Sequence, residues 1–280
     1  MNTLKNRINK AFYYIVRGGI FYWTIIILER FASSTNFTWH FYSTIAPQIF
    51  PNAFRIKMRQ FDQPPHPIKI EWIDPNLITS FTKREYPPWE YRESQFGSVQ
   101  SGNWDQQKDL TVRQEFEGPP PEIYLANKFE KSLLHQAIES RFNHGSHWEE
   151  TEFIQTVLNL VDDRSPVWHE CYSESDIWDR CDEIDRLYLN IKKNGYLTQW
   201  ELIDKGKTPS GYLHTFVNEI TVDVGRSGEL LLVSGRHRLS IAKILELERV
   251  PVTFLVRHKE WMKYRETVSE TNDHPDLRDL

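Results

Sequence analysis

The stretch Leu230–Phe254, LLLVSGRHRLSIAKILELERVPVTF, constrains the fold of this chain more than any other part of the sequence. Its first four residues form an apolar run, which is typical of a strand buried on both faces. Gly235 interrupts the chain soon after, and from Leu239 the apolar residues recur at helical spacing. A second apolar run, Val250–Val256, has a proline near its start, which indicates an edge strand or the beginning of a strand. The stretch therefore predicts a strand, a tight loop, a helix and a strand, as in α/β folds.

Three basic residues, Arg236, His237 and Arg238, lie at the predicted joint between strand and helix, and Ser234 occupies the place of an N-cap. Cationic side chains at a helix start oppose the helix dipole, at a cost of about 0.3–1 kcal/mol each when they are exposed. A helix start also presents unpaired N–H groups, which stabilise an anion. Three unfavourable placements in a row therefore favour an anion in this loop. The alternative is an ordinary solvated helix end.

These residues also resemble a known family. Gly235-Arg236-His237-Arg238, followed by LSIAK and the Val-Pro-Val strand, is similar to the signature of the ParB amino-terminal/sulfiredoxin-like superfamily. Ile70–Ile78, IEWIDPNLI, resembles the opening of such domains. The flanking segments GYLTQWEL and VRHKEW are similar to uncharacterised ParB-domain proteins of archaea and viruses.

The resemblance implies an α/β nucleotide-binding fold with a mixed sheet, in which the loop Ser234–Arg238 holds the phosphates of CTP or ATP together with Mg²⁺. Gly235 would let the backbone approach the phosphates, and Arg236 and Arg238 would neutralise them. His237 would donate a hydrogen bond or carry a proton. The expected activity is nucleotide binding with phosphate hydrolysis or transfer, and the sequence does not decide between the two nucleotides.

Two departures from better-known members limit the activities that the resemblance implies. Sulfiredoxin has a cysteine at the position of Arg236, so peroxiredoxin repair is not expected. In ParB a helix-turn-helix domain and a dimer domain follow the motif, whereas this motif lies near the end of the chain, so chromosome partitioning is not expected either. A nucleic-acid-binding or nuclease-like role is the alternative function. The net charge of -5 argues for weak binding without sequence preference.

Other polar residues are candidates for the same site. The predicted strand Glu219–Val224 alternates, and its polar face carries Glu219 and Asp223, which could serve as a base or as ligands of Mg²⁺. Solvated carboxylates would give the same pattern. Five further residues are weaker candidates, because turn and loop residues commonly face solvent: Asp105, Gln199, Arg226, Arg257 and His258.

No metal centre built by the protein itself is predicted. His144-x-x-His147 lacks the HExxH pattern, and its surroundings favour a cap and turn. The two cysteines, Cys171 and Cys181, can form neither a disulfide framework nor a zinc quartet, so a reduced cytoplasmic protein is expected.

The segment Phe12–Leu28 is almost wholly apolar and follows three basic residues. It is at the short limit for a spanning helix. A helix docked on the core, a helix lying on a membrane surface and a spanning helix are the three interpretations, so a peripheral membrane location is open.

The chain divides into three parts. Residues 1–65 are predicted as a helical extension that could contact a membrane through residues 12–28. Residues 66–262 form the ParB/sulfiredoxin-like domain, with an irregular excursion at 80–121 and a helical insertion at about 122–193. Residues 263–280 are predicted as a polar tail. The sequence does not specify an oligomeric state.

Overall fold

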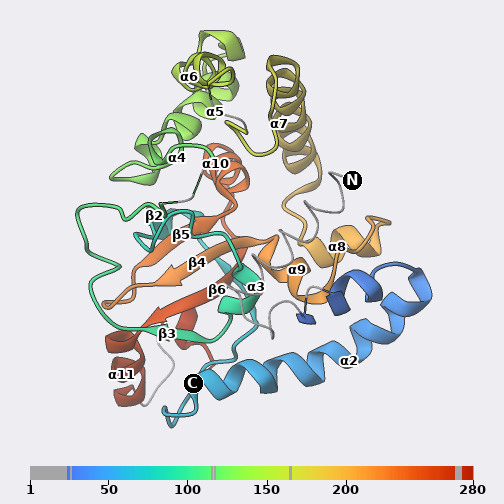
Figure 1. The fold of residues 1–280 in the computed structure, drawn as a ribbon, viewed down its shortest axis with the longest axis vertical. Coiled ribbons are helices and arrows are strands. Elements are labelled where there is room, and N and C mark those ends of the chain that lie inside the picture. The colour runs from blue at the N-terminus through green and yellow to red at the C-terminus, as the bar shows by residue number, and fades with distance from the viewer. Residues whose placement is uncertain are drawn as a thin grey trace.

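The computed structural model describes residues 24–268 and 273–279, apart from Ile26, Glu115, Glu117, Arg164 and Ser165. Within this part, a mixed six-stranded sheet lies among the helices (Figure 1), which confirms the prediction of an α/β fold. The strands are β1 (Ile70–Ile73), β2 (Ile78–Phe81), β3 (Ser98–Gln100), β4 (Ile220–Val224), β5 (Leu230–Ser234) and β6 (Val250–His258).

The strand order is β1-β6-β4-β5-β2, and β3 pairs with β6 outside that path. The pairs β1/β6 and β4/β5 are antiparallel, whereas β2/β5, β3/β6 and β4/β6 are parallel.

The helices bear the following bounds: α2 (Asn36–Arg55), α3 (Arg92–Gln95), α4 (Pro121–Tyr124), α5 (Leu133–Asn143), α6 (Glu152–Leu160), α7 (Glu174–Asn194), α8 (Gln199–Asp204), α9 (Tyr212–Val217), α10 (Arg236–Ile244) and α11 (Lys259–Thr267). Five short 3-10 turns join them: η1 (Ile56–Met58), η2 (Pro75–Leu77), η3 (Phe129–Lys131), η4 (Trp148–Glu150) and η5 (Pro275–Leu277). Residues 27–32 are helical as well.

The stretch that predicted strand, loop, helix and strand forms β5, α10 and β6. The helix begins at Arg236, three residues before the first apolar residue of the predicted stripe. The strand β6 lies inside the sheet between β1 and β4, so of the two interpretations the edge strand is wrong and the beginning of a strand is confirmed. Pro251 is instead the second residue of β6, opposite Trp72 of β1.

Side chains of β5 alternate between two cores on the two faces of the sheet. Leu230 and Leu232 belong to the larger core, which α5, α6, α7 and α10 also line. Leu231 and Val233 belong to the smaller core, which includes residues of α2 and α9. Because a core covers each face of the sheet, the sequence of β5 is a continuous apolar run.

The segment 80–121, predicted as irregular, contains two regular elements, α3 and β3. The residues of β3, just before the SGNWD sequence, pair with the end of β6. Three-residue strands leave too weak a period-two pattern to be recognised in a polar, proline-rich segment.

Both ends of the described chain pack against the sheet domain. Glu29, in the helix of residues 27–32, accepts hydrogen bonds from the backbone N–H groups of Leu213 (3.0 Å) and His214 (3.1 Å) at the start of α9. At the other end, Asp276 and Leu277 are fully buried, so the predicted polar tail is part of the fold. Most of the apolar segment 12–28 lies outside the described residues. In the part of the chain that the structure describes, no helix is long and apolar enough to cross a membrane.

Candidate anion site at the start of helix α10

The loop between β5 and α10 turns at Gly235, which has a φ of 94°. A Cβ atom on this residue would lie 2.9 Å from the Cα of Ile220 in β4. The glycine is therefore required by close packing against the neighbouring strand as well as by its left-handed backbone. Gly235 also occupies the N-cap position that the sequence assigned to Ser234, and no side chain caps α10. The first N–H groups of α10 thus keep their capacity to bind an anion.

The side chain of Arg236 is 7% exposed and lies between two aromatic rings. Its guanidinium carbon is 4.6 Å from the ring centre of Trp89 and 4.2 Å from that of Tyr124. No described carboxylate forms an ion pair with Arg236, and its Nε atom has no hydrogen-bond partner. Burial lowers the pKa of Arg236, but an arginine stays protonated in proteins. Among the described residues, therefore, the cation at the start of α10 has no carboxylate as a counter-charge.

His237, the next residue, is half-buried among other rings. Its imidazole lies 5.1 Å from that of His169 and 5.8 Å from the ring of Trp168, measured between ring centres. The Nε2 atom is buried and has no hydrogen-bond partner among the described residues. Burial lowers the pKa of His237 well below its usual value, and the neighbouring His169 and Arg180 lower it further. A neutral imidazole at pH 7 is a hydrogen-bonding group here, and it is a poor proton acceptor.

Arg238 joins the loop to two other predicted residues. Its guanidinium donates to Glu219 Oε2 at 3.4 Å and to the backbone oxygen of Asn218. The other carboxylate oxygen of Glu219 accepts from the backbone N–H of Gln199 at 2.5 Å. Burial raises the pKa of Glu219 to about 7, although Arg238 opposes this shift. The structure thus brings Glu219, Arg238 and Gln199 together beside the loop.

Asp223 lies on β4 as predicted, but its carboxylate is committed to other partners. It accepts from Arg84 Nε at 2.7 Å and Arg84 Nη2 at 3.3 Å, and from the backbone N–H of Val256 at 3.1 Å. Both residues of this ion pair are buried. Because all of these bonds hold β4 to its neighbours, Asp223 has a structural role and the prediction of a base or metal ligand is not supported.

Three of the weaker candidates form a separate cluster. Arg226 binds Asp105 through its side chain, with Nη2 to Oδ1 at 2.7 Å, and through its backbone N–H at 2.9 Å. The Nε2 atom of His258 lies 3.9 Å from Asp105 Oδ1 and forms a hydrogen bond of 2.8 Å with the backbone oxygen of Gly102. This cluster fastens the SGNWD segment to the β4–β5 turn. Arg226 is partly exposed and paired with Asp105, so the structure does not bring it to the loop before α10.

Arg257 is in neither group. It is fully buried and binds Asp276 with an Nη2–Oδ1 distance of 2.6 Å. The sequence placed it after the last strand, whereas it lies within β6. Its charge is therefore neutralised inside the protein.

The Mg²⁺ that the family resemblance implies finds no fitting protein ligands among the predicted residues. The oxygens of Asp223 and Glu219 already accept hydrogen bonds from arginine and backbone groups. In the described residues, no group of three or more His, Cys, Asp or Glu side chains is placed to hold a metal ion. The proposal below therefore contains no step that depends on a metal.

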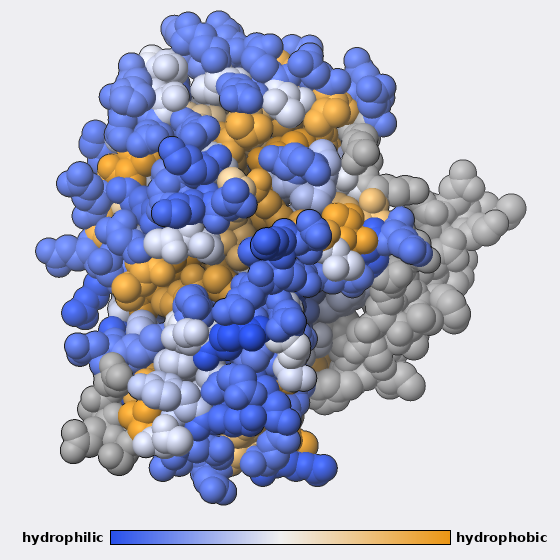
Figure 2. Space-filling view, turned by 90° about the vertical axis from the view of Figure 1, so that its left-hand side faces the viewer, coloured by the Kyte–Doolittle hydropathy of each residue, from blue (hydrophilic) through white to orange (hydrophobic). Residues whose placement is uncertain are grey.

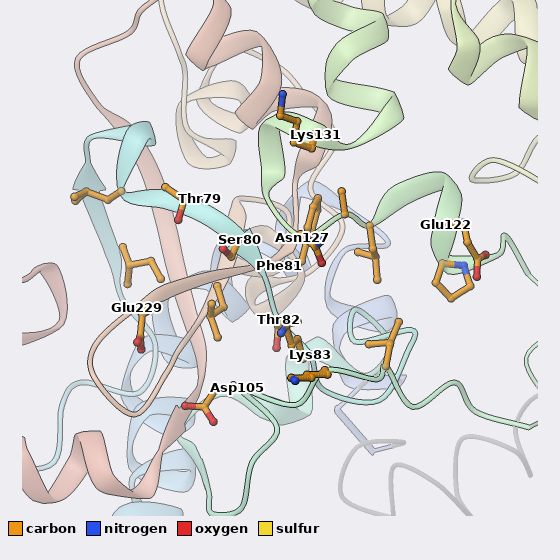
Figure 3. Close-up of a pocket in the computed structure, with 18 residues that line it drawn as sticks. Thr79, Ser80, Phe81, Thr82, Lys83, Asp105, Glu122, Asn127, Lys131 and Glu229 are labelled. Atoms are coloured by element: carbon orange, nitrogen blue, oxygen red, sulfur yellow. The ribbon is translucent and has the colours of Figure 1, made fainter.

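A large open cavity of about 810 Å³ lies elsewhere, along the outer strand β2. Figure 3 shows Thr79, Ser80 and Phe81 on this strand and Thr82 and Lys83 just after it. Glu122 lies on the opposite side of the cavity from Asp105 and Glu229. Figure 2, which views the left-hand side of Figure 1, shows apolar surface bordered by polar side chains. Three lysines and the same number of carboxylates line the cavity: Lys83, Lys108 and Lys131, and Asp105, Glu122 and Glu229. The cavity therefore has no excess of positive charge that would favour a phosphate, in contrast to the loop before α10.

Sequence reasoning did not find the residues that surround Arg236 and His237. Trp89, Tyr124, Trp168 and His169 come from loops and a short helix far from the motif in sequence. Aromatic residues are frequent throughout the chain, so composition contained no signal that could select these four.

Comparison of the chain with protein-family models, with curated proteins and with solved structures finds no match.

Proposed function

We propose that the start of α10 binds the phosphates of a nucleotide, CTP or ATP. The observation that carries the proposal is the buried guanidinium of Arg236, which has no described carboxylate partner and adjoins a helix start that no side chain caps. Cation–π contacts stabilise such a group by about 2 kcal/mol when it is desolvated, which is less than the several kcal/mol needed to bury an ion. An anionic ligand would supply the missing counter-charge.

The neighbouring residues support a phosphate as that ligand. His237 offers a ring nitrogen without a partner, and Arg238, which is 19% exposed, adds a second guanidinium beside the loop. Helix N–H groups and arginines together are the donors that phosphate groups prefer. Glu219 would act on the chemical step of hydrolysis or transfer, because a carboxylate whose pKa is about 7 can accept a proton near neutral pH.

Thermal unfolding in the presence of ligands tests the proposal. We expect CTP or ATP to raise the melting temperature, because a ligand that binds only the folded state stabilises it by RT ln(1 + [L]/Kd), or about 2.7 kcal/mol at a hundredfold excess over Kd. Inorganic triphosphate should reproduce part of the shift and the matching nucleosides none of it. If none of the four ribonucleoside triphosphates changes the melting temperature at millimolar concentration, the proposal is wrong.

Replacement of Arg236 by Met separates ligand binding from folding. Methionine fills the space between Trp89 and Tyr124 without a charge, so the unfolding free energy without ligand should change by less than about 1 kcal/mol or increase. The nucleotide-induced shift should be lost. Arg249→Gln, at an exposed arginine just after α10, is the matched control and should keep the full shift. A large loss of stability in Arg236→Met with an unchanged ligand shift would make Arg236 a structural residue.

A further inference from the structure

The described part of the amino-terminal region exposes an unusual amount of apolar surface. Half of the twelve large apolar side chains that are exposed in the described residues lie within residues 27–56. The most exposed are Phe31, at 70%, and Phe41, at 66%. The full set is Ile27, Leu28, Phe31, Phe41, Ile49 and Ile56. Clustering of this kind marks an interaction surface, whereas single exposed apolar residues do not.

Four of these side chains, together with the half-buried Ile45, form one continuous surface on two neighbouring helices. Phe41, Ile45 and Ile49 follow each other at four-residue spacing along α2, and therefore share one face of the helix. Two cavities of about 220 and 340 Å³ connect this face with Leu28 and Phe31 on the helix of residues 27–32. We name these five residues the outer apolar surface. In Figure 1, α2 runs along one margin of the molecule.

The opposite face of α2 is already occupied. Ala46, Phe50 and Phe54 are buried in the smaller core, where Phe50 stacks on Tyr212 with ring centres 5.9 Å apart. Apolar residues on the outer face are thus not needed to attach α2 to the sheet domain. Their exposure requires a different explanation.

The amino-terminal part of the sequence, which contains the outer apolar surface, is strongly basic. Residues 1–61 hold eight of the 34 Lys and Arg residues but one of the 39 Asp and Glu residues, so their net charge is +7 while that of residues 62–280 is -12. The single acidic residue, Glu29, is buried and accepts hydrogen bonds at the start of α9. Arg30, Arg55 and Arg59 are exposed. Among the described residues, none of these three arginines forms an ion pair, so the surface combines apolar side chains with unpaired basic ones.

We propose that the outer apolar surface binds the surface of a membrane that contains anionic lipids. Apolar side chains flanked by arginines match the acyl boundary and the phosphate layer of such a membrane. A second copy of the chain is a poorer occupant, because a two-fold interface would bring two positively charged surfaces together. This inference does not depend on the nucleotide proposal.

Co-sedimentation of the full chain with vesicles tests this inference. We expect binding to vesicles of phosphatidylcholine and phosphatidylserine, weaker binding to phosphatidylcholine alone, and release by high salt. The double variant Phe41→Gln/Ile49→Gln should bind at least about tenfold more weakly, because each side chain loses apolar contact with the lipid. Both residues are exposed, so the fold should be retained. Leu189→Gln, at a side chain of α7 that is 62% exposed, is the matched control and should bind normally.

The basic residues are tested separately. Arg55→Gln/Arg59→Gln should lower affinity for the phosphatidylserine vesicles by about fivefold for each arginine and change little with phosphatidylcholine. Lys259→Gln, at an exposed residue of α11, is the charge-matched control. Equal vesicle binding by wild type and Phe41→Gln/Ile49→Gln would overturn the proposal. The proposal would also be overturned if the wild type did not bind vesicles but formed a dimer in analytical ultracentrifugation that Phe41→Gln/Ile49→Gln abolishes. The surface would then join two copies of the chain.

Discussion

Glu219 is a fully buried carboxylate whose pKa is about 7, above the ordinary glutamate value of 4.5. The folded protein therefore holds this proton more tightly than the unfolded chain does. Stability from this group is fully present below about pH 4.5 and is lost as the pH rises through about 7. The loss is on the order of 3 kcal/mol.

Glu219→Gln should remove this dependence. The glutamine side chain stays neutral at every pH. Between about pH 5 and pH 8, the unfolding free energy of the wild type should therefore decrease relative to that of the variant. Urea unfolding of both proteins at the two pH values measures the difference. Parallel pH profiles would show that Glu219 is ionised throughout this range and is no candidate for a proton acceptor near neutral pH.

Among the elements, the short turn η5 is the clearest case of a polar segment held by buried charge. Asp276 accepts from Arg257 Nη2 at 2.6 Å and from Trp261 Nε1 at 2.9 Å. Burial alone would raise the pKa of Asp276, but Arg257 more than offsets this and lowers it to about 2. The turn thus joins the carboxyl-terminal segment to β6 and α11.

Asp276→Asn should destabilise the protein by about 3–5 kcal/mol, because the buried charge of Arg257 would lose its partner. Asp273→Asn, at an exposed aspartate of the same segment, is the control and should change stability by less than about 0.5 kcal/mol. Chemical denaturation measures both. If the two variants lose equally little, η5 is not held to the domain by this ion pair.

For the whole molecule, the uneven charge bears on the alternative function as a nucleic-acid-binding protein. The chain as a whole is acidic, so we expect a DNA duplex or single strand to bind with a Kd above the micromolar range at physiological salt. Any residual binding should be insensitive to Phe41→Gln/Ile49→Gln, since phosphates contact charges and not apolar side chains. Fluorescence anisotropy gives the affinities, and sub-micromolar binding would revive the nucleic-acid function.

Much of the local structure follows from the sequence. The apolar run at Leu230, the glycine at 235 and the following helical stripe predicted β5, the loop and α10. Gly195 is the C-cap of α7, with a φ of 75°, a conformation that favours glycine. These features depend on period and on backbone conformation, both of which are properties of neighbouring residues.

The partners of the polar residues were decided by the tertiary structure alone. Asp223 pairs with Arg84, 139 residues away, and Asp105 with Arg226, 121 residues away. Arg236 lies against rings of Trp89 and Tyr124. Periodicity shows which face of a strand or helix is buried, but it does not show which distant side chain the sheet order places opposite that face. For this reason the sequence indicated the basic loop before α10, and only the fold showed that Arg236 is buried there without a described carboxylate partner.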